Sequence, residues 1–218
     1  MDLTKYNTII FDCDGVLLNS NFKKSEAYRY AAIDFGATKE QAEKLVQYHV
    51  ENTGISRYVK FEYFLTNILQ QSFNEEDFSF LIKSLNHHVL KILNDCEVAT
   101  GLDKLRELTK NQHWMVMSGG DQEEVRTILA SKHLDHLFDY GIYGSPDSKH
   151  DIVKHHLENK HDFMPAIFFG DAEYDIKTAK NFNLDFIFIS GWSDFSAWEE
   201  TVKRENIKSV KHLKDLIV

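Results

Sequence analysis

The chain has 218 residues, of which 43% are hydrophobic, 13% aromatic and 27% charged, a composition that argues against a disordered or fibrous protein. Its 34 acidic and 25 basic residues give a net charge of −9, so broad attraction to nucleic acid or to an anionic membrane is disfavoured. A small anionic ligand would need local help from a metal ion or a few well-placed cations. The length allows one domain, or one domain with a small companion.

The first residues and the cysteines indicate the compartment. Residues 1–7 lack the apolar segment of a signal peptide, and no apolar run is long enough to span a membrane. Two cysteines, Cys13 and Cys96, are too few for a disulfide scaffold and form no Cys-x-x-Cys pair. We therefore expect a cytoplasmic protein with neither nucleic acid nor membrane as a partner. No feature of the sequence predicts an oligomeric state.

Four short apolar runs predict buried parallel strands, because each is continuous and is followed by glycine with small or acidic residues. They are residues 8–11 before Asp12-Cys13-Asp14-Gly15, 114–117 before Ser118-Gly119-Gly120, 166–169 before Gly170-Asp171, and 186–189 before Ser190-Gly191. Ligands of parallel sheets bind at the carboxyl ends of the strands. The four clusters that follow the runs could therefore build one site.

Residues from about 18 to 96 contain no such run, only apolar residues at helical spacing, such as Leu81, Ile82 and Leu85. From about 97 to 190 strands alternate with helices, which is typical of an α/β fold with a parallel sheet. We therefore predict an α/β core formed by residues 1–17 and 97–218, with a helical domain of residues 18–96 inserted after the first strand. Gly15 is a candidate hinge, because glycine tolerates unusual backbone angles.

Two acidic pairs stand at predicted strand ends, Asp12 with Asp14 and Asp171 with Asp175. Carboxylate oxygens from two such ends suit Mg²⁺, which proteins usually hold by one or two carboxylates together with phosphate and water. Each acid taken alone could instead stabilise a turn or the first turn of a helix.

The four motifs, taken in order, resemble motifs I to IV of the haloacid dehalogenase (HAD) superfamily: Asp12-Cys13-Asp14-Gly15-Val16-Leu17, Ser118-Gly119-Gly120, Lys149, and Gly170-Asp171-x-x-x-Asp175. The helical insertion resembles the C1-type cap of that superfamily. The resemblance covers essentially the whole chain, and four ordered motifs are far more specific than one. It implies a Rossmann-like core and a mobile helical lid.

The resemblance also implies catalytic roles. Asp12 would be the nucleophile that takes a phosphoryl group, and Asp14 would protonate the leaving oxygen and then activate water. Ser118 and the backbone N–H of Gly119 would hold phosphoryl oxygens, while Lys149 would neutralise charge on the nucleophile and the phosphate. On residue type alone, Lys149 would be a solvated surface lysine. An Asp at the position of Asp14 implies phosphatase or phosphomutase chemistry.

A Mg²⁺ ion is the cofactor that the resemblance implies. It would be bound by Asp12, by the main-chain carbonyl of Asp14 and by Asp171, with Asp175 reaching it directly or through water. In the insertion, the segment Gly54-Ile55-Ser56-Arg57 resembles the substrate-specificity loop of β-phosphoglucomutase-like members. Arg57 would bind a remote anionic group of the substrate there, since a guanidinium suits carboxylate or phosphate. It could also be an ordinary surface arginine of the cap.

The sequence thus predicts a Mg²⁺-dependent phosphatase that acts through an aspartyl-phosphate on a small phosphorylated metabolite, such as a sugar phosphate or a phosphoglycolate-like acid. One alternative is a phosphomutase of the β-phosphoglucomutase type, which would use the same residues. Another is a catalytically silent binding or regulatory protein with the HAD fold.

Overall fold

The computed structural model describes residues 2–52 and 55–217 of the chain. Its centre is a six-stranded sheet in the order β3-β2-β1-β4-β5-β6, in which all neighbouring strands are parallel. The strands are β1 Thr8–Phe11, β2 His113–Asp121, β3 Ile142–Ser145, β4 Ala166–Gly170, β5 Asp185–Ile189 and β6 Lys208–Val210. The first strand lies in the middle, so the residues that follow it are flanked by the ends of β2 and β4.

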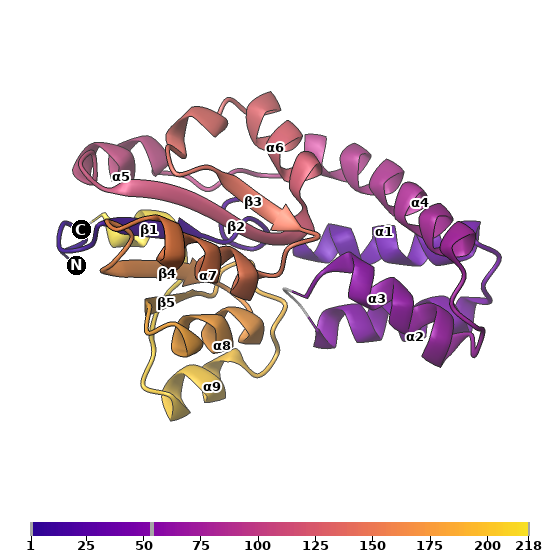
Figure 1. Cartoon of the computed structure of the whole chain (residues 1–218). Coiled ribbons are helices and arrows are strands. Elements are labelled where there is room, and N and C mark those ends of the chain that lie inside the picture. Colours follow the sequence, from indigo (N-terminus) through magenta and orange to yellow (C-terminus); the bar gives the residue numbers. More distant parts are fainter. Residues whose placement is uncertain (1, 53–54, 218) are drawn as a thin grey trace.

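Helices cover both faces of this sheet (Figure 1). One face packs against α5 Leu102–Leu108 and α6 Gln122–Ser131, and the other against α7 Lys149–Asn159 and α8 Glu173–Asn181. The last helix is α9 Trp198–Arg204, and short 3₁₀ turns occupy Asp135–Leu137 and Leu213–Leu216. Successive residues of β1 face opposite clusters, Phe11 one and Ile10 the other. Burial on both faces explains why the central strands are continuously apolar.

The insertion forms a helical cap beyond the carboxyl ends of the strands (Figure 1). Its helices are α1 Asn21–Asp34, α2 Lys39–Glu51, α3 Arg57–Tyr63, which continues as a π-helical turn Phe64–Ile68, and α4 Glu75–Asn94. Thr38 begins α2 with a capping box that it forms with Gln41, the arrangement that satisfies free N–H groups at a helix start. The predicted α/β core with a helical insertion after the first strand is confirmed.

The two edge strands, β3 and β6, do not follow from the apolar pattern. Each pairs on one side only, and both are short and partly polar, as expected where a strand is not covered on all sides. The second strand is also longer than its apolar run, because it continues through Gly119 and Gly120 to Asp121 with an irregular register after Met117. The small residues that follow the apolar run therefore form the end of the strand.

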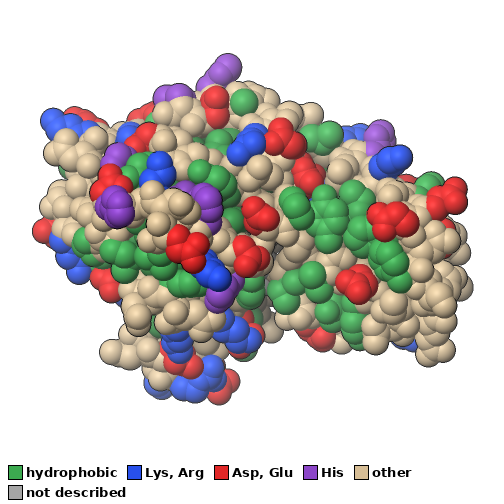
Figure 2. Space-filling view, viewed as in Figure 1, with side chains coloured by type: hydrophobic (Ala, Val, Ile, Leu, Met, Phe, Trp, Pro, Cys, Tyr) green, Lys and Arg blue, Asp and Glu red, His purple; other side chains and the backbone are tan. Residues whose placement is uncertain are grey.

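The outer surface differs between the two parts of the molecule. In the view of Figure 2, hydrophobic side chains gather on the cap, whereas most of the visible lysine, arginine and histidine side chains lie over the core. None of the helices in the described ranges combines the length and apolar character needed to cross a membrane.

Candidate active site

The end of β1 delivers Asp12 to the centre of the site. The backbone N–H of Asp12 donates to the carbonyl of Phe169 at 2.9 Å, so Asp12 still belongs to the sheet although the strand has ended. Gly15 follows with φ +77°, and a Cβ there would lie 2.1 Å from Asp171 Oδ2. Only glycine fits this turn, because it has no Cβ and tolerates a left-handed backbone. The role of Gly15 as a hinge stays a prediction.

Three buried carboxylates meet at this point, those of Asp12, Asp171 and Asp175, with one oxygen of each lying within 4.8 Å of the others. One ammonium group pairs with two of them. Lys149 Nζ lies 2.9 Å from Asp12 Oδ1 and 2.6 Å from Asp175 Oδ1. Lys149 begins α7 and is 1% exposed, so the alternative of a solvated surface lysine is wrong.

The crowding of these carboxylates changes their protonation. Burial, together with the charges of Asp175 and Asp14, raises the pKa of Asp12 to about 7 although Lys149 opposes the shift. Burial and the charges of Asp12, Asp175 and Asp194 raise the pKa of Asp171 well above its usual value. Burial disfavours the charged form of Lys149 as well, but Asp12 and Asp175 outweigh it and raise the pKa of Lys149. Three carboxyl groups thus face the one ammonium of Lys149, and this crowding favours protons or a bound cation among them.

The donor set of the cluster fits Mg²⁺. Asp171 Oδ1 is buried and has no hydrogen-bond partner within the described part of the chain, while Asp171 Oδ2 accepts from Asn21 Nδ2 at 2.7 Å. Together with the oxygens of Asp12, this unused oxygen is the kind of ligand that a hard cation takes. A buried carboxylate oxygen without a partner is otherwise unfavourable.

Asp175 is held in a different way. Its Oδ2 accepts the backbone N–H groups of Asp171 and Ala172, each at 3.1 Å, and its Oδ1 accepts from Lys149. Both oxygens are thus engaged with the protein, which favours an indirect role for Asp175: it positions Lys149 and the loop that carries Asp171.

The side chain of Asp14 points to the cap. Its carboxylate accepts from Ser20 Oγ at 2.5 Å and lies 2.7 Å from Lys24 Nζ. Burial opposes its ionisation, but the Lys24 ammonium and the Ser20 hydroxyl bring the pKa of Asp14 below its usual value. The structure therefore separates the two carboxylates of the first acidic pair, since Asp12 lies against Lys149 and Asp14 against Lys24.

The end of β2 forms another wall. Ser118 is buried, and its Oγ accepts the backbone N–H of Gly120 at 2.9 Å. Gly119 lines the cavity described below, and its carbonyl lies 2.9 Å from Ser145 Oγ. Gly119 thus lines the cavity, whereas the Ser118 hydroxyl lies beside it and accepts a hydrogen bond from the backbone of Gly120.

Arg57 is the first residue of α3 and lies between cap and core. Its guanidinium makes two hydrogen bonds to Glu124 of α6, at 2.7 and 2.8 Å, and another to Asn86 of α4. Arg57 is 3% exposed, so the alternative of a surface arginine is wrong. Both terminal nitrogens donate to the protein, whereas the buried Nε has no partner within the described residues. Gly54, predicted in the same loop, lies outside the described residues.

The neighbours of Arg57 also fasten the cap to the core. Tyr58 Oη donates to Asp121 Oδ2 at 3.1 Å, and Ser56 Oγ lies 2.8 Å from Ser145 Oγ. Glu124, the residue that anchors Arg57, was missed by the sequence analysis. Its position in the first turn of the helix after the second motif is visible in the sequence. That position indicates a role only when the contact between cap and core is known.

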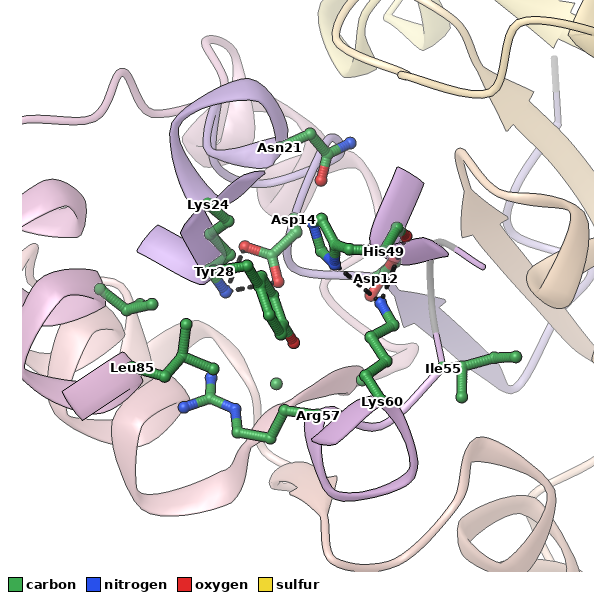
Figure 3. A pocket seen from close by; sticks show the side chains of 13 residues that line it. Asp12, Asp14, Asn21, Lys24, Tyr28, His49, Ile55, Arg57, Lys60 and Leu85 are labelled. Carbon is green, nitrogen blue, oxygen red and sulfur yellow. Dashed lines mark hydrogen bonds and ion pairs between the residues drawn. The ribbon is translucent and has the colours of Figure 1, made fainter. Parts of the chain in front are cut away.

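A cavity of about 40 Å³ lies between the core residues Asp12 and Gly119 and the cap. Figure 3 shows its cap side, where Lys24 points at Asp14, Arg57 lies beside Leu85, and Lys60 extends toward His49. Lys24 and Lys60 are both buried, and Lys24 is a residue that the sequence analysis missed.

The chain was compared with known proteins. A model of the family described as haloacid dehalogenase-like hydrolase matches residues 9–189. A predicted phosphatase from Clostridium acetobutylicum has a similar structure, with a TM-score of 0.73, 23% identity, and coverage of 97% of this chain and 96% of that one. A β-phosphoglucomutase of Clostridium difficile has a TM-score of 0.72 and 18% identity, with coverage of 96% of this chain and 92% of that one. The HAD-hydrolase YfnB of Bacillus subtilis, bound to magnesium, has a TM-score of 0.66 and 16% identity, with coverage of 97% of each chain. No curated protein sequence matches the chain significantly.

Proposed function

This chain belongs to the haloacid dehalogenase-like hydrolase family, and from that premise we propose that it is a Mg²⁺-dependent phosphatase that uses Asp12 as its nucleophile. The observation that carries the proposal is the placement of Asp12. It stands at the end of the central strand, 2.9 Å from Lys149 Nζ, and lines the cavity under the cap. The nearby orphaned oxygen of Asp171 supports a metal ion beside it.

In the first step an oxygen of Asp12 bonds to phosphorus, and the bond from phosphorus to the leaving oxygen breaks. Lys149 orients the attacking carboxylate of Asp12 and stabilises negative charge on the phosphoryl oxygens, because its ammonium lies 2.9 Å from Asp12 Oδ1. Mg²⁺ held by Asp12 and Asp171 would neutralise phosphoryl charge. Asp14 supplies a proton to the leaving oxygen. This requires a protonated Asp14, so its contact with Lys24 has to loosen when substrate enters.

In the second step water attacks the phosphorus, the bond between Asp12 and phosphorus breaks, and inorganic phosphate leaves. The charged form of Asp14 suits this step, because a carboxylate of low pKa stays ionised and can accept a proton from water. Its link to Lys24 holds it over the cavity in that form. The two acids thus have separate roles that their surroundings support.

The size of the cavity supports a small substrate. At about 40 Å³ the cavity between core and cap is small. A compact leaving group fits the closed cap better than a sugar does. This favours a hydrolase of small phosphate esters over a phosphomutase, which needs to hold a sugar beside the phosphorylated Asp12.

The test is a phosphatase assay with an activated aryl phosphate and a panel of small phosphate esters, with Mg²⁺ and with EDTA. We expect phosphate release in proportion to substrate consumed, silenced by EDTA and restored by Mg²⁺. Rapid acid quenching followed by peptide mass spectrometry should find the phosphoryl group on Asp12. Isomerisation without phosphate release would favour the mutase, and no turnover of any ester would favour a silent binding protein.

A further inference from the structure

Four basic side chains are buried around the site, and three of them pair with a carboxylate. The pairs are Lys149 with Asp12 at 2.9 Å, Arg57 with Glu124 at 2.7 Å and Lys24 with Asp14 at 2.7 Å. The fourth basic residue, Lys60 of α3, is 2% exposed and forms no ion pair with any carboxylate in residues 2–52 and 55–217. A buried ammonium without a counter-ion is unfavourable, so Lys60 differs from the other three.

The contacts of Lys60 bring no negative charge. Its Nζ lies 2.9 Å from His49 Nδ1 and 5.6 Å from the centre of the Tyr28 ring, and that ring stacks on His49. Burial, with Lys60 and other cations nearby, lowers the pKa of His49 well below its usual value, and burial raises the pKa of Tyr28 to about 12. Both partners are therefore neutral near pH 7.

The carboxylates around Lys60 act only from farther away. Asp194 and Asp14 favour its charged form, but burial and the charges of Lys24 and Arg57 prevail and lower the pKa of Lys60 to about 7. An anion placed beside Nζ would favour the ammonium form and provide the missing counter-charge. Lys60 lines the same cavity as Asp12, so such an anion would lie in the space that a substrate enters.

We propose that Lys60 binds an anionic group on the part of the substrate that is not transferred. The geometry restricts this group. Because Lys60 and Asp12 line the same cavity of about 40 Å³, a compact substrate whose anionic group lies near the phosphoryl group suits it best. The substrate class is then a phosphorylated short-chain carboxylic acid. Lys60, rather than the Arg57 of the sequence analysis, would recognise the acid, because Glu124 already occupies the guanidinium.

This inference rests on the proposed phosphatase activity, and the test separates the two. The probes are 2-phosphoglycolate and 2-hydroxyethyl phosphate, which differ in a carboxylate against a hydroxymethyl group. We expect kcat/KM of the wild-type protein to be about 10- to 100-fold higher for the acid, mainly through KM, since a hydrogen bond to a charged group is among the stronger ones. An activated aryl phosphate reports phosphatase activity independently. If that ester is not hydrolysed, the proposed function fails; if it is hydrolysed without preference for the acid, only the role of Lys60 fails.

The variant Lys60→Met removes the charge and leaves an unbranched side chain that is one atom shorter. We expect it to abolish most of the preference for the acid, whereas Lys83→Met, at an exposed lysine of α4, should keep it. An unchanged preference in Lys60→Met contradicts the inference. Should that variant not fold, the wild-type protein still decides: glycolate should inhibit hydrolysis of the aryl phosphate and ethylene glycol should not. Equal effects of the two compounds, including no inhibition by either, count against Lys60.

Discussion

The two sides of the cavity differ in the groups that lack a partner. In the described part of the chain, the core side has more carboxyl groups than cations, and the cap side has a basic group without a paired carboxylate. On the core side, the carboxylates of Asp12, Asp171 and Asp175 lie together, and Lys149 pairs with two of them, Asp12 and Asp175. On the cap side, Lys24 pairs with Asp14 and Arg57 with Glu124, whereas Lys60 forms no ion pair within residues 2–52 and 55–217 and is influenced by Asp194 and Asp14 from farther away.

This difference indicates the charge of the ligand that suits each side. The core side lacks positive charge, and its orphaned carboxylate oxygen fits a divalent cation. On the cap side, Lys60 has no paired carboxylate within the described residues, which fits an anionic group on the substrate. A chain with a net charge of −9 can thus bind a phosphate ester, because the cations that matter are buried around one small cavity.

The largest expected effect comes from the core side. Asp12→Asn removes the nucleophile at nearly constant volume, so kcat with the aryl phosphate should fall by about 10⁴-fold or more. The matched control is Asp103→Asn, at an exposed acid of α5, which should retain wild-type kcat. Retained turnover in Asp12→Asn would remove Asp12 from its assigned role.

Replacement of the shared ammonium is the next test. Lys149→Met leaves the three carboxylates without a cation, and we expect kcat to fall by about 10²- to 10³-fold, because the charge on the phosphoryl oxygens loses its stabilising partner. Lys154→Met, at an exposed lysine of the same helix, is the control. Equal kinetics in the two variants would mean that Lys149 serves the fold alone.

A smaller effect is expected on the cap side, and on stability instead of chemistry. Glu124→Gln takes the counter-charge from Arg57 and from Lys24, which lie 2.7 and 3.7 Å from its carboxylate. We expect the free energy of unfolding to fall by about 3 kcal/mol, the usual effect of breaking a buried ion pair. Chemical denaturation measures it, with Glu123→Gln, an exposed neighbour, as the control. A loss no greater than in the control would show that the contact between cap and core is weak.

The smallest expected effect is on the pH dependence of thermal stability. In metal-free protein the pKa of Asp12 is about 7, above its usual 3.8, so between these values the folded chain keeps a proton that the unfolded chain has lost. Stability from this group is therefore present at low pH and is lost as the pH rises through about 7. Mg²⁺ takes the place of the proton.

The increase in Tm caused by Mg²⁺ should accordingly be larger at pH 8 than at pH 5.5. Differential scanning calorimetry measures it, with KCl at matched ionic strength as the control. An increase that is the same at both pH values, or larger at pH 5.5, would contradict a metal site at Asp12.

The sequence predicted the core side far better than the cap side. Asp12 and Asp171 could be placed because each directly follows an apolar strand, and parallel strands end at one edge of the sheet. Lys149 needed the resemblance to the HAD superfamily, because nothing in its neighbourhood indicates burial. The pairing of Arg57 with Glu124 could not be predicted, because it depends on how the cap docks on α6. The burial of Lys60 without a paired carboxylate could not be predicted for the same reason.

The central claim is that the core side of the cavity is built for a divalent cation and the cap side is not. Calorimetric titration of Mg²⁺ into the substrate-free wild type, Asp171→Asn and Lys60→Met tests it most directly. We predict one binding site in the wild type and in Lys60→Met, and loss of that site in Asp171→Asn. Absence of binding to the wild type, or equal affinity in Asp171→Asn, would contradict the claim.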